Sequence, residues 1–221
     1  MKNFISLFLL LVFPVFADQP NKPLKRGLAA HYYSDPAYWG GNWPDEISVP
    51  NVDPSVWTFK SYAYSRIEPL INHLFIRRGW FSVRWKGFLD TKHDEGQHKG
   101  ERKGTNYSFE IHADDGCRLI IDGKIIIDDW RPCSEISSSS IRKSPSIYLE
   151  DGFHEITVEY FQGQSLKKED KDPMKLYWFC PDYHIPRQII PASRFYHTTE
   201  QAEAPERNIS LSETRQKNIK K

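Results

Sequence analysis

The feature that most constrains this chain is a β-hairpin predicted near its middle. Asp122 and Gly123 lie between two apolar runs, residues 117–121 and 124–127. Asp-Gly in this position favours a type I′ turn, because that turn needs positive φ at both central residues. Each run carries three consecutive branched residues, so we expect both faces of the hairpin to be covered. The sequence therefore predicts a hairpin in the centre of a sheet.

Other segments alternate between apolar and polar residues with the period of two that indicates a half-buried strand. The clearest examples are residues 81–86, 155–160 and 174–179, whereas Ser-rich residues 134–146 are typical of a connector. Turn-forming residues separate these segments, and no stretch has apolar residues at helical spacing. The predicted fold class is therefore all-β, an antiparallel β-sandwich or barrel.

The 221 residues suffice for one β domain with a sizeable core. Residues 1–17 have the features of a signal peptide: a positively charged N-terminal region, an apolar run and a cleavage site with a small residue. Cleavage is expected before Asp18. The run is shorter than the roughly 20 residues that span a bilayer, and no later stretch is apolar enough. We expect a lead-in over 18–26, a domain over 27–197 and a polar, disordered tail over 198–221. The expected location is extracellular or at the cell surface, or periplasmic in a bacterium.

Without residues 1–17 the chain has 29 basic and 29 acidic residues. This balance argues against nucleic acid or an anionic membrane as the main partner. The three cysteines fit no zinc pattern. In an oxidising compartment one disulfide is expected, Cys117 with Cys133, and Cys180 with Cys133 is the rival pairing. A simple two-residue turn would place Cys117 opposite Asp128.

Six segments, in order, resemble the PA-14 domain, the β-sandwich module named after anthrax protective antigen. The resemblance covers about residues 27–197, nearly the whole mature chain. The segments are Gly27-Leu28 with Tyr32-Tyr33, FSVRWKGFL (81–89), YSFEIHADDGCRLIIDGKIIIDDW (107–130), DGFHEITVEYF (151–161), KLYW (175–178) and IIPASRFY (189–196).

The resemblance implies a recognition module, often for carbohydrate. In sugar-binding fungal members, two adjacent aspartates flank a cis peptide bond and ligate Ca²⁺, which binds sugar hydroxyls. Asp114 and Asp115 match that pair. Adjacent side chains on a strand point to opposite faces, so a cis bond would turn both carboxylates to one side. A structural role for the pair, shaping the corner before the hairpin, is the alternative.

The chain departs from the fungal pattern because the loop over 162–172 contains no Asn. Gln164, Asp170 or Asp172 would have to substitute for it as a ligand. Trp130 is a second candidate, either stacking on a sugar ring or packing within the fold.

We therefore expect a lectin-like or adhesin-like module that binds glycans, with Ca²⁺ as its cofactor. The alternative is a protein-binding or assembly module that needs neither sugar nor metal. Catalysis is not expected, because the sequence shows no pair of carboxyl groups across a cleft and the family that it resembles is not itself catalytic.

Overall fold

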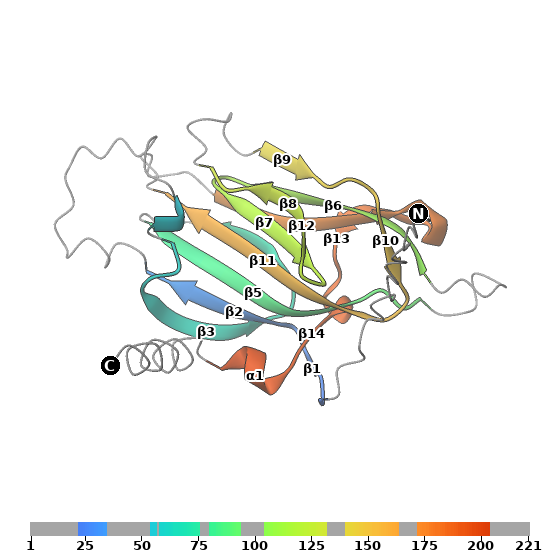
Figure 1. Cartoon of the computed structure of the whole chain (residues 1–221), viewed down its shortest axis with the longest axis horizontal. Helices are drawn as coiled ribbons and strands as arrows, with labels where there is room; N and C mark the ends of the chain where they lie inside the picture. Colours follow the sequence, from blue (N-terminus) through green and yellow to red (C-terminus); the bar gives the residue numbers. More distant parts are fainter. Residues whose placement is uncertain are drawn as a thin grey trace, which may run out of the picture.

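The computed structural model describes residues 22–34, 54–56, 58–75, 80–93, 104–131, 140–163 and 172–203. Within these residues the chain forms two antiparallel sheets that pack face to face, so the all-β prediction is confirmed (Figure 1). The strands of the first sheet are β1 (Lys25–Arg26), β2 (Leu28–Tyr33), β3 (Tyr62–Glu68), β5 (Phe81–Asp90), β7 (Cys117–Ile121), β8 (Lys124–Asp129), β11 (Phe153–Gln162) and β14 (Phe195–His197).

The second sheet is built around β6 and β12, which pair along most of their length. Its strands are β4 (Asn72–Phe75), β6 (Gly104–Ala113), β9 (Ser140–Lys143), β10 (Ile147–Glu150), β12 (Asp172–Cys180) and β13 (Ile185–Ile189). Short 3-10 helices lie at Pro54–Val56, Pro181–Tyr183 and Ala192–Arg194, and helix α1 covers Thr199–Ala202.

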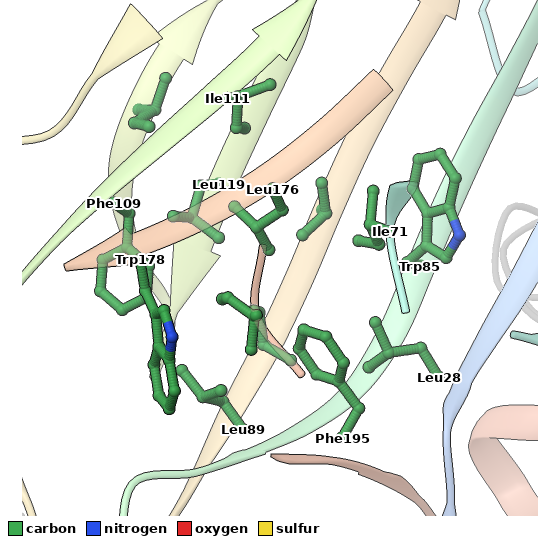
Figure 2. Close-up of a cluster of buried hydrophobic side chains, with 14 of the residues drawn as sticks. Leu28, Ile71, Trp85, Leu89, Phe109, Ile111, Leu119, Leu176, Trp178 and Phe195 are labelled. Atoms are coloured by element: carbon green, nitrogen blue, oxygen red, sulfur yellow. The ribbon is translucent and has the colours of Figure 1, made fainter. Parts of the chain in front are cut away.

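The core lies between the sheets because alternate residues of each strand point inward. Strand β5 pairs with β11 over its full length, and Val83 and Trp85 are completely buried. Figure 2 shows Trp85, Leu89 and Phe195 of the first sheet in one cluster with Phe109, Ile111, Leu176 and Trp178 of the second. The alternating segments identified in the sequence thus supply the inward-facing rows of both sheets.

The predicted hairpin forms as β7 and β8, joined at Asp122 and Gly123 with φ of 49° and 73°. Its register differs from that of a regular hairpin. A β-bulge places one extra residue on β8 opposite the Leu119–Ile120 step, so Cys117 pairs with Asp129 rather than with Asp128. The expected Cys117–Asp128 pairing is therefore wrong by one residue.

The predicted position of the hairpin in its sheet is correct for β7 only. Strand β7 lies between β11 and β8, whereas β8 pairs with β7 alone among the described strands and forms the edge of the first sheet. Ile125 is accordingly 58% exposed, while Ile127 is buried. The three consecutive isoleucines of β8 thus lie in a bulged edge strand and not in a central one. The bulge turns only one of them, Ile127, fully into the core.

The ends of the fold lie beside one another. β1 falls within the expected lead-in and pairs with β14, and α1 falls within the expected tail. The ordered fold thus extends beyond 27–197 on both sides. The predicted signal peptide lies outside the described residues, and none of the helices in the described part of the chain is long and apolar enough to span a membrane.

Candidate functional site

The acidic corner Asp114-Asp115-Gly116 connects β6 to β7, at one end of the sandwich. Both carboxylates contact the residues that end β11. The Oδ2 atom of Asp115 accepts a hydrogen bond from the backbone N–H of Gly163 at 2.6 Å. The Oδ2 atom of Asp114 accepts one from the side-chain amide of Gln162 at 3.1 Å. The corner thus points both acids toward the same connection between β11 and β12.

The peptide bond between Asp114 and Asp115 is trans, because the described residues contain no cis peptide bond. The expectation of a cis bond, taken from the fungal members, is therefore wrong for this structure. The two carboxylates nevertheless reach neighbouring residues, since the chain bends at the corner instead of continuing as a strand.

Gly116 completes the corner through a close approach. A β-carbon at this position would lie 2.1 Å from a ring carbon of Phe161, far inside van der Waals contact. Phe161 is buried, and the backbone N–H of Phe161 donates a hydrogen bond to the carbonyl of Gly116 at 3.0 Å. Glycine is thus required here because a ring occupies the space of its missing side chain.

Arg142 of β9 holds the corner from the other side. Its guanidinium donates to the backbone carbonyls of Ala113 at 2.6 Å, Asp115 at 3.1 Å and Asp114 at 3.4 Å. It also donates to Oδ2 of Asp129 at 2.9 Å. Arg142 and Asp129 are both buried, so this ion pair links an edge of each sheet and secures the corner between them.

The bulge in β8 determines which aspartate faces Arg142. Because of the extra residue, Asp129 turns inward, and Asp128 turns outward to accept a hydrogen bond from Arg118 at 2.7 Å. Burial raises the pKa of Asp129, but hydrogen bonds from Arg131 and Arg142 outweigh that effect and lower the pKa below its usual value. Asp129 is therefore ionised at neutral pH.

Negative charge gathers on the inner side of the corner, around the hydroxyl of Tyr160. The pKa of Tyr160 lies well above its usual value, first because the group is buried and then because Asp115, Asp172 and Asp114 are nearby. Tyr160 donates a hydrogen bond to the Gln162 side chain, which orients the amide of Gln162 toward Asp114. Asp172, a candidate from the sequence, is buried at the start of β12.

The corner presents the carboxylate oxygen atoms of Asp114 and Asp115. Carboxylates are the ligands that Ca²⁺ prefers, and the ion takes 6–8 oxygen atoms. Within the described residues, no three carboxylate, imidazole or thiolate side chains lie close enough to hold an ion. Two of the expected substitutes, Gln164 and Asp170, lie outside the described residues.

A cavity of about 600 Å³ opens beside β8 and β9, and Trp130 and Arg142 both line it, whereas Asp114 and Asp115 are not among the described residues that line it. The ring of Trp130 is contacted by Phe161, with centroids 4.9 Å apart, and by the guanidinium of Arg118 at 4.5 Å. The structure thus places Trp130 at the cavity but with its ring already packed, which favours the packing interpretation over stacking on a sugar.

Two of the three cysteines lie within the described residues. Cys117 is buried in β7 and Cys180 is buried at the end of β12. Cys133 lies outside the described residues, so the Cys117–Cys133 disulfide and its rival stay predictions.

Sequence reasoning identified Asp114, Asp115 and Trp130 but missed Gln162, Asp129 and Arg142. Arg142 lies in the segment interpreted as a Ser-rich connector, where β9 forms instead. A single arginine among serines gives no periodic signal. The sequence could have indicated Gln162, because it ends the alternating run that leads toward the corner.

Comparisons with known proteins agree with this architecture. The chain is 30% identical over 147 residues to the anti-sigma-I factor RsgI3 of Acetivibrio thermocellus, which covers 62% of this chain and 19% of that protein. The solved structure of an anti-sigma factor domain-containing protein is 25% identical, with a TM-score of 0.56, covering 82% of this chain and 51% of that one. The chain thus spans about half the length of these relatives, or less.

A third match covers nearly the whole of its counterpart. The PA14 sugar-binding domain from an RTX adhesin is 15% identical, with a TM-score of 0.52, over 78% of this chain and 98% of that one. This likeness shows the fold. The family model for the PA14 domain matches residues 76–189, more than half of the chain. The chain therefore belongs to the PA14 domain family.

Proposed function

We propose that this PA14 domain is a secreted or surface-exposed carbohydrate-binding module whose ligand site lies at the Asp114–Asp115 corner. The main support is that both carboxylates point toward the same connection between β11 and β12. The PA14 domain of the RTX adhesin, which shares the fold, is described as sugar-binding.

Asp114 and Asp115 are the proposed ligands of a calcium ion, together with oxygen atoms from residues 164–172. The carboxylates of Asp115, Asp172 and Asp114 all contribute to the raised pKa of Tyr160, and a bound cation would relieve the repulsion among them. When bound, Ca²⁺ would supply a positively charged centre to which vicinal sugar hydroxyls can bind. Asp115 and Asp114 would orient it, and Gln162 would hold Asp114 in place.

Thermal unfolding tests the calcium assignment. Because only the folded chain holds the ion, Ca²⁺ at 100 times its dissociation constant should stabilise the fold by roughly 2.7 kcal/mol. Mg²⁺ should have less effect, because it demands tighter octahedral geometry. Asp115→Asn should remove the calcium shift. The matched control is Asp128→Asn, since Asp128 is an aspartate of β8 that faces outward.

Glycan binding is tested separately, by an array probed with calcium and again with chelator. We expect binding to selected glycans that chelator abolishes and that Asp115→Asn loses while the domain stays folded by circular dichroism. A melting temperature that is indifferent to millimolar calcium would refute the metal, and an array without any signal would refute sugar binding.

A protein-binding role is the second candidate, because the two relatives with the highest identity reported above are named as anti-sigma factors. This role predicts that the domain binds a protein partner in the presence of chelator and that Asp115→Asn leaves that binding unchanged. The calcium and glycan experiments therefore separate the two functions.

A further inference from the structure

The outward face of the second sheet carries most of the large hydrophobic side chains that the described part of the chain exposes. Seven such side chains are exposed, and four of them lie on this face: Leu74, Ile141, Tyr148 and Phe179. Tyr148 and Phe179, for example, each alternate with a core residue, Leu149 and Trp178. Single exposed hydrophobic residues need no explanation, but a group on one face of one sheet marks a candidate contact surface.

Two aromatic rings on this face have surfaces that are open to a ligand. The side chains of Tyr148 and Phe179 are 58% and 41% exposed. Within the described residues, neither ring contacts another aromatic ring or a guanidinium group. Tyr177 also faces outward, but the guanidinium of Arg187 covers its ring at 4.0 Å from the ring centroid. Tyr148 and Phe179 therefore form the aromatic part of the surface.

Strand β6 separates these two rings. Tyr148 of β10 pairs with Asn106, and Phe179 of β12 pairs with Ser108, two residues farther along β6. From the strand spacing and the rise per residue of a β-sheet, the Cα atoms of Tyr148 and Phe179 lie about 12 Å apart. Asn106 is exposed and Ser108 is half-buried, and an amide and a hydroxyl can each donate and accept hydrogen bonds. The surface thus consists of two aromatic platforms with neutral polar groups between them.

The charged side chains around the rings balance one another. Glu110, the next outward residue of β6, pairs with Arg187 at 2.5 Å and with Lys143 at 3.2 Å. Glu150 lies two residues beyond Tyr148 and is exposed on the same side of β10. These four groups, two acidic and two basic, sum to zero charge. They offer no excess of positive charge to an acidic ligand, and the carboxylate of Glu150 would repel one.

These features suit a neutral sugar chain. The C–H face of a sugar ring is apolar and packs on an aromatic ring, while its hydroxyl groups exchange hydrogen bonds with amide and hydroxyl side chains. The separation of the platforms exceeds the length of one sugar ring, so a chain of several units is needed to reach both. An apolar protein surface would instead leave Asn106 and Ser108 without hydrogen-bond partners.

We infer that the outward face of the second sheet binds an extended, neutral polysaccharide chain, with one sugar unit on Tyr148 and another on Phe179. This surface is separate from the proposed corner site. The corner follows Ala113 at one end of β6, whereas Ser108 lies about 20 Å away along the strand. Binding here therefore requires neither calcium nor Asp115, and it should survive chelator.

Calorimetry in the presence of chelator tests this inference, because chelator silences the proposed calcium site. The probes are cellohexaose, xylohexaose, their dimers and a uronic acid hexamer. We expect a neutral hexamer to bind more tightly than its dimer, which cannot reach both rings, and more tightly than the acidic hexamer. The double variant Y148A/F179A should weaken that binding about tenfold or more, because two stacking contacts are lost. Both side chains are exposed, so the fold should persist, and circular dichroism checks this.

Tyr64→Ala is the matched control, since Tyr64 is an exposed tyrosine of the first sheet whose ring stacks on Tyr32. It should bind like the wild type. Failure of both neutral hexamers to bind, an unaffected double variant, or equal binding of the acidic hexamer would each overturn the inference. A dimer of this chain in analytical ultracentrifugation that Y148A/F179A dissociates would also overturn it.

The same variants separate this surface from the corner. Binding that resists chelator, is kept in Asp115→Asn and is lost in Y148A/F179A supports the sheet surface, whatever the outcome at the corner. Binding that needs calcium, is lost in Asp115→Asn and is kept in the double variant would leave the corner as the sole sugar site and overturn the inference.

Discussion

At the scale of single residues, Gly116 shows why the acidic corner has its sequence. An Asp-Asp-Gly triplet suggests a glycine that is needed because a turn imposes a positive φ. Gly116 does not have a positive φ, unlike Gly123 in the hairpin turn. Its requirement comes instead from the ring of Phe161, which occupies the place of a β-carbon. The same contact fixes β11 against the corner and thereby positions Gln162 and Gly163 beside the two carboxylates.

Gly116→Ala should therefore destabilise the domain by about 1–3 kcal/mol, the usual cost of overpacking a buried contact. Urea unfolding measures this. Gly123→Ala is the control: no atom lies within 4 Å of the added carbon, so only the positive φ of 73° is penalised. Phe161→Leu should relieve the clash, so G116A/F161L should cost less than the two single changes added together. Strict additivity would contradict this account.

A second single residue, His154, gives the stability a defined pH dependence. Its Nδ1 lies 2.6 Å from Oδ2 of Asp122, and its Nε2 lies 2.7 Å from the carbonyl of Glu150. Both ring nitrogens face acceptors, which favours the doubly protonated imidazolium. Burial lowers the pKa of His154, but the hydrogen bonds to Asp122 and Glu150 outweigh it, and the pKa is raised above its usual value.

Because the folded-state pKa is higher than the unfolded one, the stabilisation is complete below about pH 6.5 and disappears as pH rises through the folded value. The free energy of unfolding should fall more between pH 6 and 9 in the wild type than in His154→Gln, a window that follows from the direction of the shift. An NMR titration should place the midpoint of His154 above 6.5, and Asp122→Asn should lower it. A midpoint below 6.5 would exclude this interpretation.

At the scale of elements, the bulge in β8 connects the hairpin to the candidate site. Without the extra residue, Asp128 would face inward and Asp129 outward. With it, Asp129 meets Arg142 of β9, and Arg142 in turn holds three carbonyls of the corner. One inserted residue in an edge strand thus determines how the corner is supported from the opposite sheet.

Removing Arg142 should be costly, because among the described residues Asp129 would keep the exposed Arg131 as its remaining ion-pair partner. Arg142→Gln is expected to lower the free energy of unfolding by about 3 kcal/mol, the usual result of breaking a buried ion pair. Arg131→Gln is the control and should cost about 1 kcal/mol or less, since its side chain is 58% exposed. Chemical denaturation of both variants measures the difference, and equal losses would disprove the supporting role of Arg142.

The sequence predicted the elements whose signals are local. Period-two alternation located β5, β11 and β12, and Asp122-Gly123 located the hairpin and its turn. Edge status, the bulge and β9 were not predictable, because they depend on which strands meet in space. The same distinction holds for the site: Asp114 and Asp115 are adjacent in sequence, whereas Arg142 reaches them only through the pairing of β9 with β6.

At the scale of the whole molecule, two buried carboxylates join the sheets at opposite sides. Asp129 meets Arg142 beside the corner. Across the sandwich, Glu68 accepts hydrogen bonds from Tyr32 and Trp85 of the first sheet, both at 2.5 Å, and lies 2.9 Å from Nε2 of His73 in the second. Burial raises the pKa of Glu68, but the bonds from His73, Trp85 and Tyr32 outweigh it and lower the pKa to about 2.

Because this pKa is depressed on folding, the contribution of Glu68 is present above its unfolded value of 4.5 and is lost as pH falls toward 2. Glu68→Gln should therefore destabilise the domain at neutral pH and flatten the acid limb of its stability profile. Urea unfolding from pH 7 to 2 measures both effects. A variant as sensitive to acid as the wild type would contradict the assignment.

The pairing of β1 with β14 also has a mechanical consequence. These strands are antiparallel, with Lys25 opposite His197 and Arg26 opposite Tyr196, so the two ends of the fold leave from the same side. Tension applied through the flanking residues therefore pulls β1 and β14 apart perpendicular to their length. Their backbone hydrogen bonds break one after another, and are not loaded in parallel as they would be if the strands were sheared along their length. The domain should yield at its margin under low force, long before the ladder between β5 and β11 carries any load.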